Sequence, residues 1–291
     1  MRERMRLLLV IATATLPVIA ACSSGPNHTC SSGEALTICA TGTVVQGVDV
    51  SVFQGTVDWT KVKAAGIDFA FARVSDGTGT LDTTFAANWK GMQAAGIVRG
   101  VYQFFEPGED PVMQADLVMS QVKAAGGFEA GDLPPVMDME VTGGQTDATI
   151  QANMQSWLTE IETTYGRNAV IYTNESTSTH FGGKFTAYPL WVASWGGTCP
   201  TMPDGFTVWE FWQYADTGTI SGITGAVDHD EFNGSLSDLQ AWANPTPPSD
   251  GGTPPSDAGT VMIDSGAHDA STSTPDATTP AADAATNPCG A

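Results

Sequence analysis

The chain has 291 residues, and its 32 acidic and 11 basic side chains give a formal net charge of −21. This excess of negative charge opposes binding to nucleic acid phosphates and to anionic membrane surfaces, so we expect neutral or cationic partners and no nucleic acid. The length suffices for one domain with a full hydrophobic core.

The first 21 residues have the pattern of a secretion signal. Three arginines precede an apolar run, Leu7 to Ala21, that is too short for a stable membrane span. The run ends in Ile19-Ala20-Ala21-Cys22, which resembles the lipobox of bacterial lipoproteins. The resemblance implies cleavage before Cys22, lipid on its sulfur and export to the cell envelope. Ser23 does not suggest inner-membrane retention, so we expect the outer membrane; an ordinary cleaved signal is the alternative.

Composition divides the remaining chain into three parts. We interpret residues 22–43 as a lipidated N-terminal spacer and residues 44–243 as one globular domain. Residues 244–291 are rich in Pro, Thr, Ser, Ala, Gly and Asp and contain no Lys or Arg. Because such a segment cannot bury enough apolar surface to offset its ordering entropy, we expect a disordered tail.

With Cys22 assigned to lipid, four cysteines remain: Cys30, Cys39, Cys199 and Cys289. An even number in an exported chain fits an oxidising compartment, and we expect Cys30 to pair with Cys39. The chain has no CxxC pair, and its histidines are scattered without ligand spacing. We therefore expect no metal and no other cofactor.

Three Ala-Ala-Gly triplets recur thirty residues apart and end at Gly66, Gly96 and Gly126. Each triplet closes a helical pattern that opens near an acidic residue, and its glycine suits a left-handed helix cap. The repeat therefore predicts one β/α unit per period. The predicted helices are 58–65, 82–95 and 110–125, followed by a longer one at 148–165.

Short apolar runs alternate with these helices, which indicates β/α units and a parallel sheet. The last three runs are separated by loops too short for full helices. We therefore expect an α/β protein with a single irregular barrel, similar to a TIM barrel, of about eight strands and about five helices. In such barrels the reactive residues lie at the C-terminal ends of the strands. The predicted strands are 44–50, 67–74, 97–105, 135–141, 169–174, 190–195, 208–214 and 226–232.

The fourth predicted strand ends in two acidic residues, Asp138 and Glu140. Because side chains alternate along a strand, these two face one side and the adjacent methionines the other. Two carboxylates so close in an apolar strand repel each other, so one is expected to hold its proton near neutral pH, as a general acid does. The alternative is a structural role, with the carboxylates satisfied by helix caps or by Arg73 and Arg99.

Five motifs that follow one another in this region resemble glycoside hydrolase family 25. They cover nearly all of residues 44–232. The motifs are Gly-Val-Asp-Val-Ser at 47–51, Gly-Val-Tyr-Gln-Phe at 100–104, Asp-Met-Glu at 138–140, Leu-Trp-Val-Ala at 190–193, and Trp-Gln-Tyr at 212–214 through Val-Asp at 227–228.

Members of that family are muramidases, which cut the β-1,4 bond from N-acetylmuramic acid to N-acetylglucosamine in peptidoglycan, on a barrel of eight strands and about five helices. The resemblance implies that Glu140 is the acid/base and Asp138 its partner carboxylate. It also implies that Asp49 and Asp228 flank the site. The positions that match residues lining the sugar cleft are Tyr102, Tyr172 and Gln213.

The chain departs from the family at Gln103, where the usual sequence is Tyr-His-Phe. A Gln side chain can hydrogen-bond a sugar but cannot take a charge, so we expect a change in the tuning of the site or in a substrate contact there. Trp195 is a further candidate, because its ring could stack on a sugar face.

These observations predict a monomeric enzyme that acts on peptidoglycan glycan strands and is held at the membrane by its lipid. Two other functions stay open: a catalytically silent wall-binding lipoprotein, and a chitin-type N-acetylglucosaminidase. Intact Asp138 and Glu140 favour an enzyme over a silent binder, and a digestion assay separates peptidoglycan from chitin.

Overall fold

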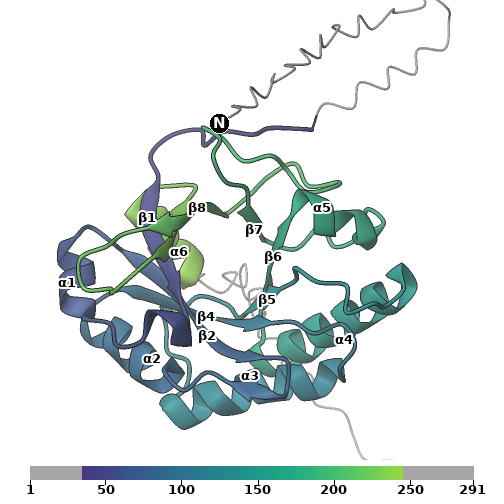
Figure 1. Cartoon of the computed structure of the whole chain (residues 1–291), viewed down its shortest axis with the longest axis horizontal. Helices are drawn as coiled ribbons and strands as arrows, with labels where there is room; N and C mark the ends of the chain where they lie inside the picture. The colour runs from purple at the N-terminus through teal and green to yellow at the C-terminus, as the bar shows by residue number, and fades with distance from the viewer. Residues whose placement is uncertain (1–34, 245–291) are drawn as a thin grey trace, which may run out of the picture. The chain divides into compact units, whose positions relative to one another are not determined.

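The computed structural model describes residues 35–244, and these form a closed barrel of eight strands. The barrel closes because β1 pairs with β2 on one side and with β9 on the other. Figure 1 shows this ring of strands nearly end-on. The predicted irregular β/α barrel is therefore confirmed. The strands are β1 (Val45–Val50), β2 (Phe69–Asp76) with its short hairpin partner β3 (Thr80–Leu81), β4 (Val98–Phe104), β5 (Val136–Asp138), β6 (Val170–Asn174), β7 (Leu190–Ala193), β8 (Phe211–Gly218) and β9 (Val227–Phe232).

The last strand, β9, runs antiparallel to both of its neighbours, whereas the sequence predicted a parallel sheet. The connection from Gly218 to Val227 is too short for the crossover of roughly a dozen residues that parallel neighbours require. As a consequence, the first residues of β9 reach the same rim of the barrel as the last residues of the other seven strands.

Helices α1 to α4 cover the outside of one side of the ring, as Figure 1 shows. In the described part of the chain, the last three strands follow one another without a long helix between them, as the loop lengths predicted. The helices are α1 (Trp59–Ala64), α2 (Phe85–Ala94), α3 (Pro111–Ala125), α4 (Asp147–Tyr165), the short α5 (Glu175–Ser178) and α6 (Leu236–Ala243), with single 3-10 turns at η1 (Val52–Gln54) and η2 (Thr179–Phe181).

The thirty-residue repeat marks the helix ends correctly. Its three glycines have positive φ angles of 93°, 70° and 129°, a conformation that side chains disfavour. Asp58 and Asp110 accept hydrogen bonds from first-turn N–H groups and so cap α1 and α3. Helix α2 begins at Phe85, later than predicted, because Asp82 makes other contacts that are described below.

Two hydrophobic layers hold the barrel together, one inside it and one between strands and helices. Inside, the rings of Phe71 and Trp191 stack with centroids 4.5 Å apart, and those of Phe69 and Phe211 lie 5.3 Å apart. Leu239 of α6 joins this inner layer. The interior is therefore a packed core, and an open pocket remains only where the inward side chains become polar.

Cys39 forms a disulfide with Cys199, so the predicted pairing of Cys30 with Cys39 is wrong. The two Cα atoms are 4.6 Å apart although the residues are separated by 160 positions. A β-bridge between Thr37 and Thr201 runs beside the disulfide. Residues 35–43, which we had interpreted as part of the spacer, therefore pack against the barrel. Cys30 lies outside the described residues.

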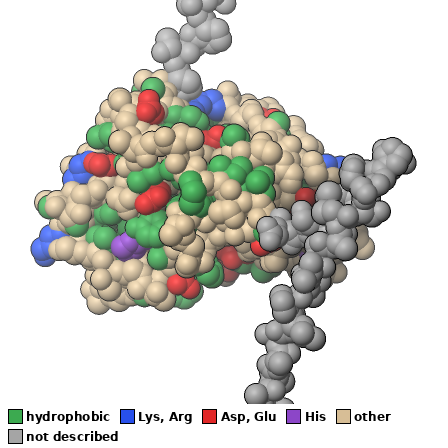
Figure 2. All heavy atoms as spheres, turned by 90° about the horizontal axis from the view of Figure 1, so that it is seen from above, with side chains coloured by type: hydrophobic (Ala, Val, Ile, Leu, Met, Phe, Trp, Pro, Cys, Tyr) green, Lys and Arg blue, Asp and Glu red, His purple; other side chains and the backbone are tan. Residues whose placement is uncertain are grey.

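Several expectations fall on parts of the chain that the structure does not describe. These are the signal peptide at 1–21, the lipidated Cys22, the first part of the spacer and the tail from residue 245. Between residues 35 and 244, no helix is long and apolar enough to cross a membrane. On the face drawn in Figure 2, Lys and Arg side chains are few and lie toward the outline.

Candidate active site

Each of the eight barrel strands contributes at least one side chain to a pocket at the mouth of the barrel. The pocket has a volume of about 270 Å³. Glu140, two residues beyond the end of β5, lines it as well. Because β9 is antiparallel, Asp228 near its start lies opposite Asp49 near the end of β1. The strand residues that line it are Asp49 (β1), Arg73 (β2), Tyr102 and Phe104 (β4), Asp138 (β5), Tyr172 (β6), Trp191 (β7), Gln213 and Asp216 (β8) and Asp228 (β9).

Asp138 and Glu140 both face this pocket, while Met137 and Met139 are buried in the outer layer, as strand alternation predicted. Burial raises the pKa of Asp138 well above its ordinary value of 3.8, and the nearby charge of Glu140 raises it further. Burial also raises the pKa of Glu140 above 4.5. The pair can therefore hold a proton near neutral pH, which is what a general acid requires.

Neither arginine considered as a structural partner is bonded to these two carboxyl groups. Arg99 instead makes two hydrogen bonds to Asp132, of 2.7 and 2.9 Å, near the start of β4. Arg73 reaches the pocket, but its Nε donates to Asp82. Within residues 35–244, Oδ1 of Asp138 is buried and has no hydrogen-bond partner. The carboxyl groups at the mouth are thus left uncompensated by direct ion pairs.

Asp49 and Asp228 form a second acidic pair, on the adjacent strands β1 and β9. Burial, followed by the charge of Asp228, raises the pKa of Asp49 well above its ordinary value. Burial raises the pKa of Asp228 from 3.8 to about 6, with further contributions from the charges of Asp216 and Glu140. In the circular order of strands, β9 lies opposite β5, so the two acidic pairs face each other across the mouth.

Gln213 connects three other pocket residues through its amide group. Its Nε2 donates to Asp49 Oδ2 at 2.8 Å. Its Oε1 accepts hydrogen bonds from the Tyr172 hydroxyl at 2.8 Å and from Trp195 Nε1 at 3.0 Å. The Trp195 ring remains 54% exposed at the rim, so it offers a flat apolar face to a ligand. Tyr102, Tyr172, Gln213 and Trp195 all line the pocket, and their contact with a sugar stays a prediction.

Gln103 does not line the pocket, which corrects the prediction that it contacts substrate. It follows Tyr102 on β4, so strand alternation turns its side chain outward. There it is fully buried, donates to Ser75 Oγ at 2.9 Å and accepts from Trp157 Nε1 of α4 at 2.8 Å. The replacement of the family's usual His therefore changes a contact between the barrel and α4.

Sequence reasoning missed further residues of the site. Asp230, two positions after Asp228, lies fully buried inside the barrel, and its Oδ1 accepts a hydrogen bond from Trp191 Nε1 at 2.9 Å. Burial raises its pKa well above the ordinary value. Arg73, Phe53 and Asp216 also line the pocket. Strand alternation, which placed Asp138, predicts both missed residues. Arg73 follows the inward-facing residues of β2, and Asp230 lies two positions after Asp228 on β9.

A β/α barrel that gathers acidic side chains of raised pKa at its mouth, beside exposed aromatic rings, has the features of an enzyme that cleaves glycosidic bonds. Comparison with known families agrees with this class. The profile of the family described as "Glycosyl hydrolases family 25" matches residues 48–223. The chain belongs to this family and is a glycoside hydrolase.

Individual relatives point in the same direction. The chain is 39% identical over 215 residues to "Lysozyme M1" of Streptomyces globisporus, a match that covers 69% of this chain and 72% of the relative. It is 29% identical over 217 residues to "N,O-diacetylmuramidase" of Chalaropsis sp, covering 68% of this chain and 99% of the relative. A solved bacterial lysozyme from Streptomyces coelicolor aligns with a TM-score of 0.64 at 36% identity, over 70% of this chain and 98% of that one.

Proposed function

We propose that this enzyme is a muramidase, which hydrolyses the β-1,4 bond between N-acetylmuramic acid and N-acetylglucosamine in peptidoglycan. The observation that carries the proposal is the meeting of two acidic pairs at the mouth of a barrel of this family. The names of the relatives, lysozyme and N,O-diacetylmuramidase, support the choice of substrate.

In the proposed mechanism Glu140 is the general acid that protonates the leaving glycosidic oxygen. Its raised pKa supports this role, because an acid must keep its proton at the working pH. Asp138 lies on the same strand and therefore on the same wall of the pocket. We assign it to the 2-acetamido group of the sugar, whose oxygen attacks the anomeric carbon while Asp138 orients the amide N–H.

Substrate assistance is preferred over a covalent glycosyl-enzyme because Asp138 lies on the same wall of the pocket as the acid, while burial favours the protonated form of Asp49 across the pocket. A nucleophilic carboxylate must be ionised and must face the acid across the sugar, with carboxyls about 5 to 5.5 Å apart. Asp49 and Asp228 lie on the opposite wall, but burial raises the pKa of both. In this proposal they stabilise developing positive charge or position the water.

The function is tested by digesting purified peptidoglycan with the protein and identifying the new reducing ends by mass spectrometry. We expect reducing ends on muramic acid. Reducing ends on glucosamine would instead identify a glucosaminidase, and the absence of cleavage would contradict an active enzyme.

The mechanism is tested separately with a thiazoline analogue of the cyclic intermediate. Competitive inhibition is expected if the acetamido oxygen is the nucleophile. A glycosyl ester trapped on Asp138, Asp49 or Asp228 would replace this mechanism with the covalent one, and product of inverted anomeric configuration would contradict both.

We also propose that the enzyme works as a monomer at the bacterial cell envelope, exported and anchored in the outer membrane through lipid on Cys22. The pattern around Cys22 supports the anchor, and the disulfide between Cys39 and Cys199 fits an oxidising compartment. Metabolic labelling with palmitate should mark the wild type but not Cys22→Ser, and light scattering should give the mass of one chain.

A further inference from the structure

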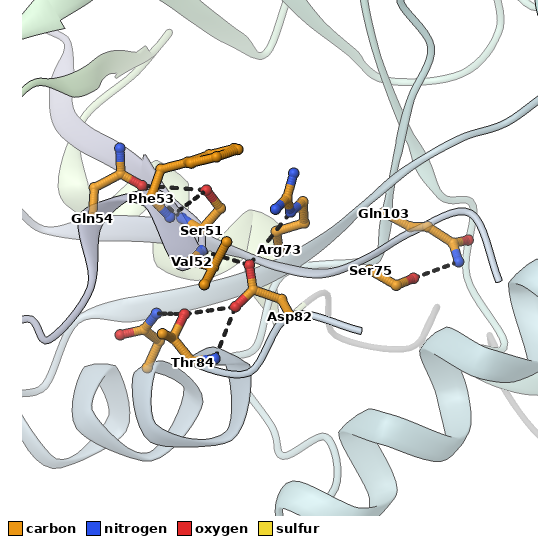
Figure 3. Close-up of polar contacts among 10 residues, drawn as sticks. Ser51, Val52, Phe53, Gln54, Arg73, Ser75, Asp82, Thr84 and Gln103 are labelled. Atoms are coloured by element: carbon orange, nitrogen blue, oxygen red, sulfur yellow. Dashed lines mark hydrogen bonds and ion pairs between the residues drawn. The ribbon is translucent and has the colours of Figure 1, made fainter. Parts of the chain in front are cut away.

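A cationic group and an exposed aromatic ring meet on one wall of the catalytic pocket. Figure 3 shows Arg73 between Phe53 and Asp82. The guanidinium carbon of Arg73 lies 5.2 Å from the centre of the Phe53 ring, a cation–π distance. The Phe53 ring is 81% exposed although it lines the pocket. An exposed Phe at a pocket wall contributes little to the core, and its ring face is open to a ligand.

Asp82 fixes this pair in place through hydrogen bonds that use both of its oxygens. One oxygen accepts from the backbone N–H of Val52 at 2.6 Å and from Arg73 Nε at 3.4 Å. The other accepts from the backbone N–H and the hydroxyl of Thr84, at 2.9 and 2.6 Å. Asp82 therefore holds the turn that carries Phe53 and the inner nitrogen of Arg73 at the same time (Figure 3).

The terminal nitrogens of Arg73 remain free to bind a ligand. Within residues 35–244 its guanidinium makes no hydrogen bond apart from the one through Nε, and the side chain keeps 11% of its surface exposed. Arg73 is also the one basic side chain among the pocket-lining residues of the described part, which include five acidic ones. Arg73 is therefore the charged side chain of this pocket that is suited to bind an anionic group of a substrate.

The two sugars of peptidoglycan differ by one substituent that matches this pair. Muramic acid carries a lactyl ether at O3, with a methyl group and a carboxyl group, and the carboxyl is free or amide-linked to a peptide. Glucosamine has a hydroxyl there. An arginine fork is complementary to a carboxyl oxygen, and an aromatic ring is complementary to a methyl group.

We propose that Arg73 and Phe53 form a lactyl-binding subsite, in which Arg73 donates to the carboxyl or amide oxygen and Phe53 packs against the methyl group. The subsite makes the enzyme select N-acetylmuramic acid over N-acetylglucosamine. This inference rests on the proposed muramidase function and names the residues that determine its specificity.

The test measures binding by calorimetry in the full chain with Glu140→Gln, so that ligands are not consumed. The probes are a peptide-free oligosaccharide of alternating N-acetylmuramic acid and N-acetylglucosamine, its peptide-bearing form, and chitotetraose. Arg73→Met should weaken binding of the peptide-free probe by about tenfold, the effect of losing one charge-assisted hydrogen bond. Binding of the peptide-bearing probe should weaken less, because its amide carries no charge, and binding of chitotetraose should stay within about twofold.

Two further variants separate the subsite from general effects of charge. Phe53→Ala, which changes an exposed side chain, should reduce the preference for the muramic probe over chitotetraose by a few-fold. Lys90→Met removes a positive charge from the exposed face of α2 and should change none of the three affinities. Melting temperatures establish that each variant is folded.

Equal weakening of all three probes by Arg73→Met would overturn the inference, because Arg73 would then act on the pocket as a whole. Unchanged binding of the muramic probes would overturn it as well. The proposed function is judged independently by whether the wild type releases muramic reducing ends from peptidoglycan, so its failure is distinguishable from failure of the subsite.

Discussion

Buried charged groups form an ion pair at one end of the barrel, whereas the buried carboxyl groups of the pocket at the other end have no direct ionic partner among the described residues. Near the start of β4, the Arg99 guanidinium meets the Asp132 carboxylate in a two-point ion pair, and the Trp89 ring lies 4.0 Å from the guanidinium carbon. At the mouth, Asp49, Asp138 and Asp228 lie among other carboxyl groups, and their pKa values are raised by burial.

The ion pair near the start of β4 has a structural role, whereas the carboxyl groups at the mouth have a role in chemistry. In a buried ion pair each charged group is the other's partner, so removing either one leaves an uncompensated charge. Buried carboxyls without cationic partners destabilise the folded state at neutral pH but keep protons available, which a glycosidase needs. Substitutions at the two ends should therefore have opposite consequences for activity and stability.

The largest effect on chemistry is expected from Glu140→Gln. Loss of a general acid lowers kcat by about 10² to 10⁴-fold, while the similar shape of the amide leaves the melting temperature nearly unchanged. Turnover on peptidoglycan and differential scanning calorimetry measure the two quantities. A variant that kept more than about a tenth of wild-type turnover would remove Glu140 from the proposed role.

The largest effect on stability is expected from Arg99→Met, near the start of β4. Removing one partner of a buried ion pair leaves Asp132 uncompensated and should lower the free energy of unfolding by about 3 to 5 kcal/mol. Where the variant is still folded, its kcat should match the wild type. Urea unfolding measures the change in the free energy of unfolding. The double variant Arg99→Met/Asp132→Leu should recover part of the loss. A single variant as stable as the wild type would contradict the stabilising role of this ion pair.

Asp138→Asn should have an intermediate effect on turnover. The amide oxygen can still accept the acetamido N–H, so we expect a loss of about tenfold, the cost of weakening one hydrogen bond. A loss as complete as that caused by Glu140→Gln would favour a nucleophilic role for Asp138. Steady-state kinetics on soluble glycan fragments distinguish the two outcomes.

The smallest effect concerns stability as a function of pH. The pKa of Asp228 is raised from 3.8 to about 6, so its contribution to stability is present below pH 4 and is lost as the pH rises through 6. Asp228→Asn should therefore unfold like the wild type at pH 4 but be more stable at pH 7.5, by about 1 kcal/mol after allowance for solvent screening. Thermal melts at both pH values test this, with the exposed Asp204→Asn as a control. If the stability difference between Asp228→Asn and the wild type were the same at both pH values, the predicted pH dependence would be wrong.

Much of the barrel could be predicted from local sequence patterns. The Ala-Ala-Gly repeat located three helix ends, and alternation in β5 placed Asp138 and Glu140 on one side, because both signals depend only on residues close in the chain. The antiparallel direction of β9 was missed because an apolar run carries no information on strand direction.

Contacts between distant residues limited the rest. The partner of Cys39 is 160 positions away, and no local pattern selects Cys199 over the nearer Cys30. Gln103 was assigned to the pocket by family resemblance alone, although alternation from Tyr102 would have turned it outward. Arg73 was considered only as a partner of the carboxylates, because the sequence does not show that Asp82 and Phe53 hold it.

The claim that the mouth keeps a proton for catalysis can be measured directly by a ¹³C NMR titration of the Glu140 side-chain carboxyl. Selective labelling of glutamate carboxyls, with Glu140→Gln to assign the signal, gives the pKa of this group in the folded enzyme. The account predicts a midpoint above the ordinary value of 4.5, because burial disfavours the charged form. A midpoint at or below 4.5 would show that Glu140 is ionised at neutral pH and would contradict its role as the acid.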